Sequence, residues 1–177
     1  LAEKGMTVNE DRFNELMQEQ KQRARNARAD LSSWDSAAGD ALEGIAKTEF
    51  TGYEETESEA AILAILTDED KVDTITEGSF RLILDRTPFY GEGGGQVGDT
   101  GVISADGFEF TVSNTTKNNN GIFLHKGVVS KGSVAVGDCC VSAVDASRRE
   151  AIKRNHTAAH LLQAALRKVL GTHVEQA

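Results

Sequence analysis

The feature that most constrains the fold is a run of short strand-like segments between residue 48 and residue 144. These segments are rich in Ile, Val, Thr and Leu, and no helical pattern separates them. The strands are expected at 60–66, 71–76, 79–84, 101–104, 108–112, 121–129 and 140–144. The residues at 105–107 (ADG) and 118–121 (NNNG) are hairpin signals. Short strands at nearly regular spacing predict a small antiparallel barrel.

Helical patterns flank this region on both sides. The sequence TVNE at 7–10 predicts a capping box that opens a helix to about Ala29, and its narrow apolar stripe is typical of a helix that links two domains. The stretch up to Gly44 has the composition of a linker. A second helix is expected to begin at Asp145 or Ser147 and to end at Gly171. The expected fold class is therefore α+β.

The second helix carries the sequence NHTAAHLL at 155–162. His156 and His160 are four residues apart, so their imidazoles project from the same side of the helix, which is the spacing for two nitrogen ligands to one Zn²⁺. They lie roughly opposite an apolar stripe that includes Leu162 and Val169. Thr157 follows the first His where a metalloprotease needs Glu, so that motif is excluded. Two unrelated surface histidines are the alternative.

A glycine-rich stretch at 85–101 contains six glycines and the only proline of the sequence. It lacks Gly-Lys-Ser/Thr and does not open a helix, which excludes a phosphate loop and a dinucleotide fingerprint. It could be a tight crossover between strands with Phe89 and Tyr90 in the core. It could also be the wall of a cleft, in which buried Glu92 and Gln96 would need polar partners.

Charge and cysteine usage limit the partners and the compartment. The net charge of −9 argues against indiscriminate binding to a phosphate backbone, although basic residues crowd the first and last helices. No apolar run is long enough to cross a bilayer and no signal peptide is visible, so no membrane association is expected. The adjacent Cys139 and Cys140 cannot form an ordinary disulfide framework, and as strand residues they are expected to act as small apolar groups in a cytoplasmic protein. A chain that starts at Leu1 and stops soon after its last helix looks like a piece of a longer polypeptide.

Four blocks of the sequence together carry a resemblance to a known family. They are RTPFYGEGGGQVGDTG at 86–101, RR at 148–149, NHTAAHLL at 155–162 and GTHVEQ at 171–176. Their order and spacing resemble the start of the editing region of alanyl-tRNA synthetases, which is shared with the free-standing AlaX deacylases. The resemblance implies three parts: the end of the tRNA-recognition helices and a linker (1–44), a translation-factor-like β-barrel (45–145), and the first helix of a truncated zinc-containing editing domain (146–177).

The resemblance also implies roles for particular residues. In that family the editing site hydrolyses seryl- or glycyl-tRNA(Ala) made in error, and His156 and His160 match two of its zinc ligands. The other implied site residues are Gln176 and Ala159 in the catalytic pocket, and Arg86, Gly94, Gly95 and Gln96 on the substrate-binding side.

One departure from the family limits what this chain can do alone. The remaining zinc ligands, in a Cys-x-x-x-His pattern, lie beyond this sequence, and Cys139 and Cys140 do not occupy their positions. Zinc is therefore expected to be absent or weakly bound, and the fragment to be inactive. ATP and Mg²⁺ belong only to an aminoacylation site outside this sequence. The expected partners are tRNA(Ala) and the other domains of the parent chain.

Two functional classes remain open. Hydrolysis of an aminoacyl ester needs an oriented water, and a metal can polarise the reacting groups. Editing is needed because an alanine-sized pocket cannot reject glycine or serine strongly by binding alone. The competing class is a non-catalytic tRNA-binding or domain-positioning barrel. A generic zinc hydrolase is the poorest of the options because of the missing Glu.

Overall fold

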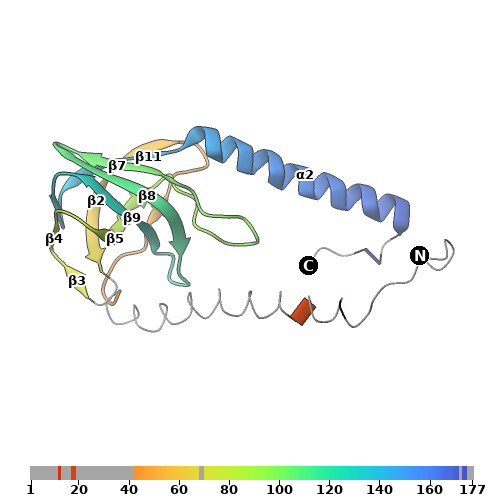
Figure 1. The fold of residues 1–177 in the computed structure, drawn as a ribbon, viewed down its shortest axis with the longest axis horizontal. Coiled ribbons are helices and arrows are strands. Elements are labelled where there is room, and N and C mark those ends of the chain that lie inside the picture. Colours follow the sequence, from red (N-terminus) through yellow and green to blue (C-terminus); the bar gives the residue numbers. More distant parts are fainter. Residues whose placement is uncertain (1–11, 13–16, 19–41, 68–69, 172, 175–177) are drawn as a thin grey trace. The chain divides into compact units, whose positions relative to one another are not determined.

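The computed structural model describes residues 12, 17–18, 42–67, 70–171 and 173–174. The chain divides into two compact units, Leu1–Glu43 and Gly44–Ala177. In the first unit Arg12, Met17 and Gln18 are helical, and the rest of the expected N-terminal helix and most of the linker lie outside the described residues. The second unit contains the strands and the C-terminal helix (Figure 1).

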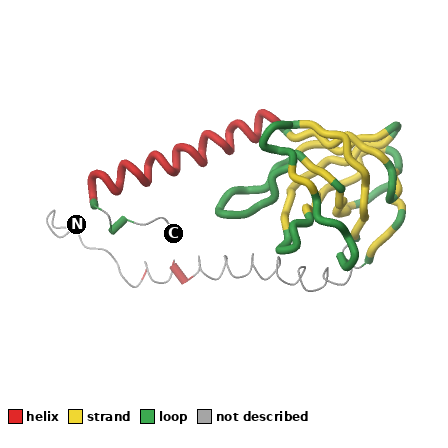
Figure 2. The backbone as a smooth tube through the Cα atoms, turned by 180° about the vertical axis from the view of Figure 1, so that it is seen from behind, coloured by secondary structure: helices red, strands yellow, loops and turns green. Residues whose placement is uncertain are grey.

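Antiparallel strands of the second unit close into a barrel (Figure 2). The barrel strands among the described residues are β2 (Glu57–Leu66), β5 (Ser79–Leu84), β7 (Gly101–Ala105), β8 (Phe108–Lys117), β9 (Phe123–Lys131) and β11 (Cys139–Val144). Their order is β11-β7-β8-β9-β5-β2, and β2 pairs back with β11 to complete the circle. The predicted small antiparallel barrel is therefore confirmed.

Short strands extend the barrel at its margins. They are β1 (Glu49–Phe50) parallel to β6 (Arg86–Thr87), β3 (Lys71–Val72) beside β2, and β4 (Thr74–Ile75) beside β10 (Val134–Ala135). The single strand expected at 71–76 is thus wrong, because the chain changes partner at Asp73. The carbonyl of Asp73 accepts a hydrogen bond from the Val136 N–H at 2.8 Å, and the strand bends there.

The barrel core follows from the alternation of side chains along each strand. In β8 the buried Phe108, Phe110 and Val112 alternate with exposed residues. Cys140 of β11 lies in this core, and burial raises the pKa of its thiol to about 12, so the thiol stays protonated. Cys139 is exposed, so the expectation that both cysteines fill apolar positions is wrong for Cys139. Alternation explains the difference, because neighbouring strand residues face opposite sides.

His125 is the largest polar side chain that the barrel encloses completely. Its Nδ1–H donates to the carbonyl of Leu82 (3.0 Å), because a carbonyl can only accept. Its Nε2 then accepts from the hydroxyl of Thr87 (2.8 Å), whose oxygen accepts the N–H of Phe89 (3.2 Å). Burial lowers the pKa of His125 to about 4, so the ring is neutral near pH 7.

The C-terminal helix is α2 (Ala146–Leu170). Its N-cap is Asp145, whose carboxylate accepts the N–H of Arg148 at 2.9 Å, and Gly171 follows its last turn with φ of 112°. The helix therefore begins at the first of the two expected cap positions. Every residue from Lys153 to Leu162 is exposed, including Leu161 and Leu162 of the predicted apolar stripe. Among the described residues, no helix has both the length and the apolar character required to span a bilayer.

Candidate functional site

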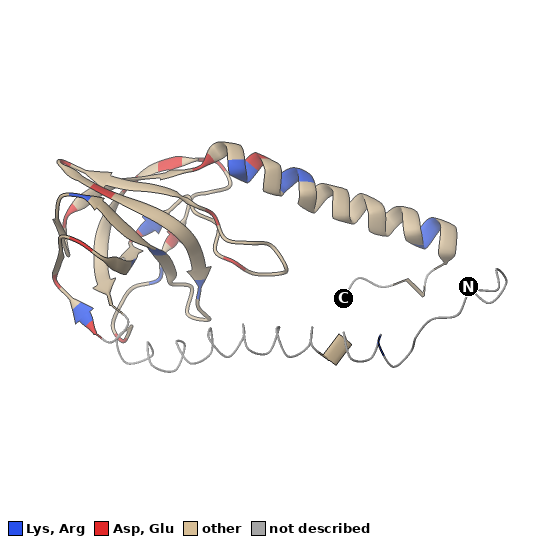
Figure 3. Ribbon diagram, in the orientation of Figure 1, with Lys and Arg blue, Asp and Glu red and all other residues tan. Residues whose placement is uncertain are grey.

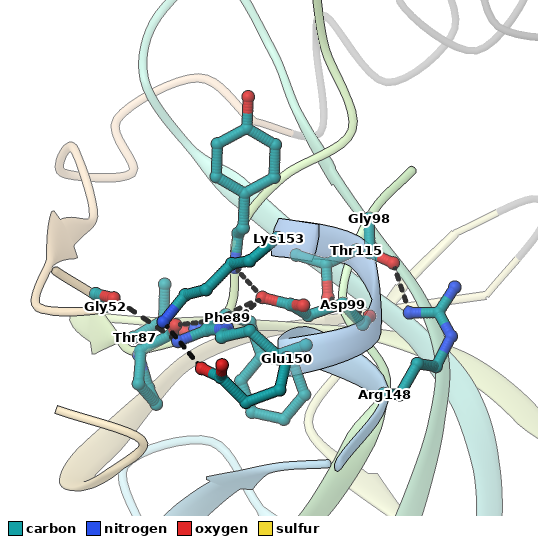
Figure 4. Close-up of polar contacts among 12 residues, drawn as sticks. Gly52, Thr87, Phe89, Gly98, Asp99, Thr115, Arg148, Glu150 and Lys153 are labelled. Atoms are coloured by element: carbon teal, nitrogen blue, oxygen red, sulfur yellow. Dashed lines mark hydrogen bonds and ion pairs between the residues drawn. The ribbon is translucent and has the colours of Figure 1, made fainter. Parts of the chain in front are cut away.

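Arg149 ties the first turn of α2 to the glycine-rich segment of residues 85–101. Its side chain is buried, and its guanidinium donates to the carboxylate of Asp99, with the Nε–Oδ2 distance at 3.0 Å and a second contact through Nη2. The same group donates to the carbonyls of Pro88 and of Gly52, the latter at 3.3 Å. One side chain thus joins separate parts of the chain, and Figure 4 labels two of its partners, Gly52 and Asp99.

Asp99 and Arg148 complete this junction. The Asp99 carboxylate also accepts the N–H of Tyr90 at 2.7 Å, and its backbone carbonyl accepts the hydroxyl of Thr115 at 3.1 Å. Arg148 donates from Nη1 to the carbonyl of Gly98 at 2.8 Å (Figure 4). A buried ion pair whose guanidinium nitrogens are all bonded holds one geometry, so the direction in which α2 leaves the barrel is fixed at its first turn.

The tip of the glycine-rich segment is a two-residue turn. Gly93 and Gln96 exchange backbone hydrogen bonds of 3.1 and 3.0 Å, and between them Gly94 and Gly95 have φ values of 58° and 78°. Positive φ at both central positions is the requirement of a type I′ turn, which glycine meets without strain. A side chain at either glycine would meet nothing within 4 Å, so both face open space.

The crossover interpretation of this segment is correct for Phe89, whereas the buried Glu92 expected of a cleft wall is wrong. Phe89 is buried, as a crossover requires, but Tyr90 is only half-buried. Glu92 is exposed and its carboxylate accepts the amide of Asn114 at 3.0 Å, so it is not the buried group that a cleft wall would need to satisfy. Gln96 is half-buried. The N–H of Glu92 donates to the carbonyl of Thr115 at 2.8 Å, so its backbone lies against β8 while its side chain stays exposed.

His156 and His160 lie side by side on the exposed surface of α2. Their Nε2 atoms are 2.9 Å apart and their ring centroids 4.6 Å apart. Two imidazole nitrogens bound tetrahedrally to one Zn²⁺ at about 2.0–2.1 Å would be about 3.3 Å apart, so a small opening of this pair would fit the metal. Within the part of the chain that the structure describes, no group of three or more His, Cys, Asp or Glu side chains could hold a metal ion. The described residues thus supply two ligands of the three or four that zinc takes.

The other predicted site residues are spread over the second unit. Ala159 is exposed between the two histidines, and Gln176 lies outside the described residues. Arg86 is half-exposed and donates from Nη2 to Glu49 at 3.1 Å. No hydrogen bond within the described ranges joins Arg86 or the turn at residues 93–96 to the histidine pair. The glycine-rich segment is instead joined to the histidine-bearing helix by the ion pair of Asp99 and Arg149.

Sequence reasoning did not single out Asp99 or Gly52. Asp99 stands in the glycine-rich stretch and Arg149 in a block of its own, 50 residues later, so no periodicity links them. Gly52 lies outside every block. A Cβ there would be 2.2 Å from the carbonyl oxygen of Pro88, which shows how closely the two backbones approach.

Figure 3 marks the charged residues along α2, and their side chains fall into two groups by burial. Arg149 is enclosed at the junction, whereas Lys153 and Glu150 form an exposed ion pair at 3.0 Å. The hydrogen bond and charge of Lys153 lower the pKa of Glu150. Arg154, Arg167 and Lys168 are exposed further along the helix. The basic groups of α2 are thus partly structural and partly free to meet solvent or a polyanion.

Comparison with known proteins points to one family. The family described as tRNA synthetases class II (A) matches residues 1–148. The alanine–tRNA ligase of Saccharophagus degradans (strain 2-40) is 46% identical over 175 residues, that of Clostridioides difficile (strain 630) 43% over 180, and that of Chelativorans sp. (strain BNC1) 42% over 185. These alignments cover 98%, 100% and 99% of this chain and 19%, 20% and 20% of the relatives, so the chain spans about a fifth of their length. It belongs to the class II (A) tRNA synthetases and, within them, to the alanyl-tRNA synthetases.

Proposed function

We propose that this chain is part of the editing region of an alanine–tRNA ligase, which hydrolyses seryl- or glycyl-tRNA(Ala) made in error. The observation that carries the proposal is the junction of Asp99 with Arg149. It brings the glycine-rich block and the histidine-bearing helix into one unit, although they are 50 residues apart in the sequence. These are two of the blocks on which the resemblance to the editing region rests.

The chemistry assigned to each group follows from its position. His156 and His160 would hold two coordination positions of a Zn²⁺, and the bound ion would polarise or orient the groups of the ester and the water. The ion pair of Asp99 and Arg149 fixes the helix that carries the two rings. Gly94 leaves open space over the backbone, so a substrate can approach it closely. Ala159, between the rings, adds little bulk to a pocket built there.

The test uses the full-length protein that carries this stretch. His156→Ala and His160→Ala are each expected to lower its zinc content, measured by elemental analysis, and to slow the deacylation of seryl-tRNA(Ala). Arg154→Ala, an exposed change on the same helix, is the matched control and should leave the zinc content unaltered. Unchanged zinc in both histidine variants would show that the ligand assignment is wrong.

The second candidate is a non-catalytic module in which the barrel binds or positions the tRNA. It is favoured by the closed barrel and by the presence of only two metal ligands among the described residues. Strong, salt-sensitive binding of tRNA(Ala) in a mobility-shift assay, without deacylation by the full-length protein, would support it. For this chain alone we expect weak tRNA binding, no deacylation and little zinc, which an elemental assay beside the full-length protein would measure.

A further inference from the structure

Aromatic rings gather on the barrel beside the glycine-rich segment, outside the histidine pair. The ring of Phe50 stacks on Phe123 with centroids 5.5 Å apart and planes at 2°. The same ring meets Tyr53 edge-on at 5.0 Å and Tyr90 at 6.5 Å. Phe123 is buried and anchors the group, whereas Phe50 and Tyr90 are half-buried. The rings therefore form a step from the core to the surface, with Tyr53 outermost.

The side chain of Tyr53 is almost fully exposed to solvent. Its exposed fraction is 89%, the largest among the exposed large hydrophobic side chains that the structure describes. It occupies a tight turn in which the N–H groups of Glu54 and Glu55 both donate to the carbonyl of Thr51 at 3.1 Å. Gly52 packs the same turn against the barrel, since a Cβ there would lie 2.6 Å from the Phe50 ring. A hydrogen-bonded turn thus presents the Tyr53 ring to solvent.

Two lysines flank the rings. The Nζ of Lys117 is 5.3 Å from the centroid of Phe123, and Lys117 is the strand partner of Phe123 across β8 and β9. The side chain of Lys47 lies across Gly121, where a Cβ would be 2.9 Å from its Cε. Both lysines are exposed, and neither forms an ion pair within the described ranges. An exposed ring beside ammonium groups that form no ion pair is the combination that binds single-stranded nucleic acid.

We propose that this aromatic patch, made of Phe50, Tyr53, Tyr90, Phe123, Lys47 and Lys117, binds a single-stranded RNA. A base stacks on Tyr53, and the phosphates run toward Lys47 and Lys117. The identification of the strand as the unpaired 3′ end of a tRNA rests on the proposed function, whereas the chemistry of the patch does not.

Acidic neighbours set the direction of the strand. Glu54 and Glu55 follow Tyr53 in the turn and are exposed, so they repel phosphates from that side. The other nearby carboxylates are engaged, Glu49 with Arg86 and Glu92 with Asn114. A strand can therefore present a base to the tyrosine while its backbone lies on the lysine side. This arrangement predicts that removing the two glutamates strengthens binding.

The experiment measures the affinity of the complete 177-residue chain for a fluorescein-labelled single-stranded RNA ending in CCA, by fluorescence anisotropy. Tyr53→Leu is expected to weaken binding by at least about fivefold, and Tyr53→Phe to preserve it, because stacking needs the ring and not the hydroxyl. Lys117→Gln should weaken binding and lower the slope of log Kd against log salt by about 0.7, as expected for one phosphate contact. The combined change Glu54→Gln and Glu55→Gln should tighten binding.

Controls separate a local effect from a general one. Lys71→Gln alters an exposed lysine on β3, away from the patch, and should change neither the affinity nor the salt slope. A blunt-ended RNA duplex should bind more weakly than the single strand. Absence of binding to the single strand, or equal affinities of Tyr53→Leu and the unaltered chain, would overturn the proposal. Because the assay requires neither zinc nor hydrolysis, it can fail while editing is confirmed, and it can succeed while editing fails.

Discussion

His125 shows how a single buried side chain makes stability depend on pH. Its ring bonds Leu82 at one nitrogen and Thr87 at the other, so the neutral form is fully satisfied inside the barrel. Protonation of Nε2 would create a positive charge in a site that is closed to water. Burial therefore opposes the charged form, and the pKa falls from 6.5 to about 4.

We predict that the free energy of unfolding decreases as the pH falls from about 6.5 to about 4. In that window the unfolded histidine binds a proton that the folded one does not, so acid favours unfolding, whereas above pH 7 this contribution is constant. The full difference is about 3 kcal/mol. Urea unfolding at a series of pH values checks it. In His125→Gln the curve should be flatter over the same window, and an identical slope in both proteins would contradict the assignment.

At the scale of elements, the hydrogen bonds between α2 and the barrel in the described part of the chain come from the first turn of the helix. Asp145 caps it, and Arg148 and Arg149 bind the glycine-rich segment, whereas the residues from Lys153 to Leu162 are exposed. The bounds of α2 and the spacing of its histidines could be predicted from the sequence. The cap, the end at Gly171 and the shared side of the two histidines follow from local patterns. The pairing of Asp99 with Arg149 could not be predicted, because it depends on how the barrel brings distant segments together.

We predict that Arg149→Ala lowers the free energy of unfolding by about 3–5 kcal/mol, because it leaves the buried carboxylate of Asp99 without its cation. Lys153→Ala removes the exposed partner of Glu150 on the same helix and should leave the free energy of unfolding unchanged. Equilibrium urea unfolding of both variants makes the comparison. Equal stabilities of the two variants would show that the junction at Asp99 does not support the fold.

At the scale of the second unit, burial is unevenly distributed. The core residues lie in the barrel, and the only buried residue of α2 is Arg149. Local stability follows the density of buried contacts, so the barrel and the distal part of α2 should open separately.

Hydrogen exchange tests this division. Amides of α2 beyond Lys153 are expected to exchange faster than those of β8 and β9, because the helix there has exposed side chains and no described barrel contact. Mass spectrometry of the labelled chain gives both rates in one sample, with the strands as the internal control. Equal protection of the two regions would indicate that something covers the distal helix.

The barrel was predictable where strand length and turns are local properties. The hairpin at residues 105–107 is confirmed as a two-residue connection, with Ala105 paired to Phe108 and Gly107 at φ of 70°. Residues 79–84 match β5 in full. The misplaced features depend on partners: the strand at 71–76 divides because its halves pair with different strands, and the parallel contact of β1 with β6 joins segments 37 residues apart. Such pairings are set by the closed fold.

The closure of β11 against β2 determines how the chain passes through this module. Ala143 faces Glu57 across the ladder, and the N–H of Val144 donates to the carbonyl of Thr56 at 2.9 Å, so the polypeptide enters and leaves the barrel at neighbouring points. A module with adjacent entry and exit can be inserted into a longer protein without separating the parts before and after it. Evolution could thus add, exchange or release such a cassette as a whole while the host architecture stays intact.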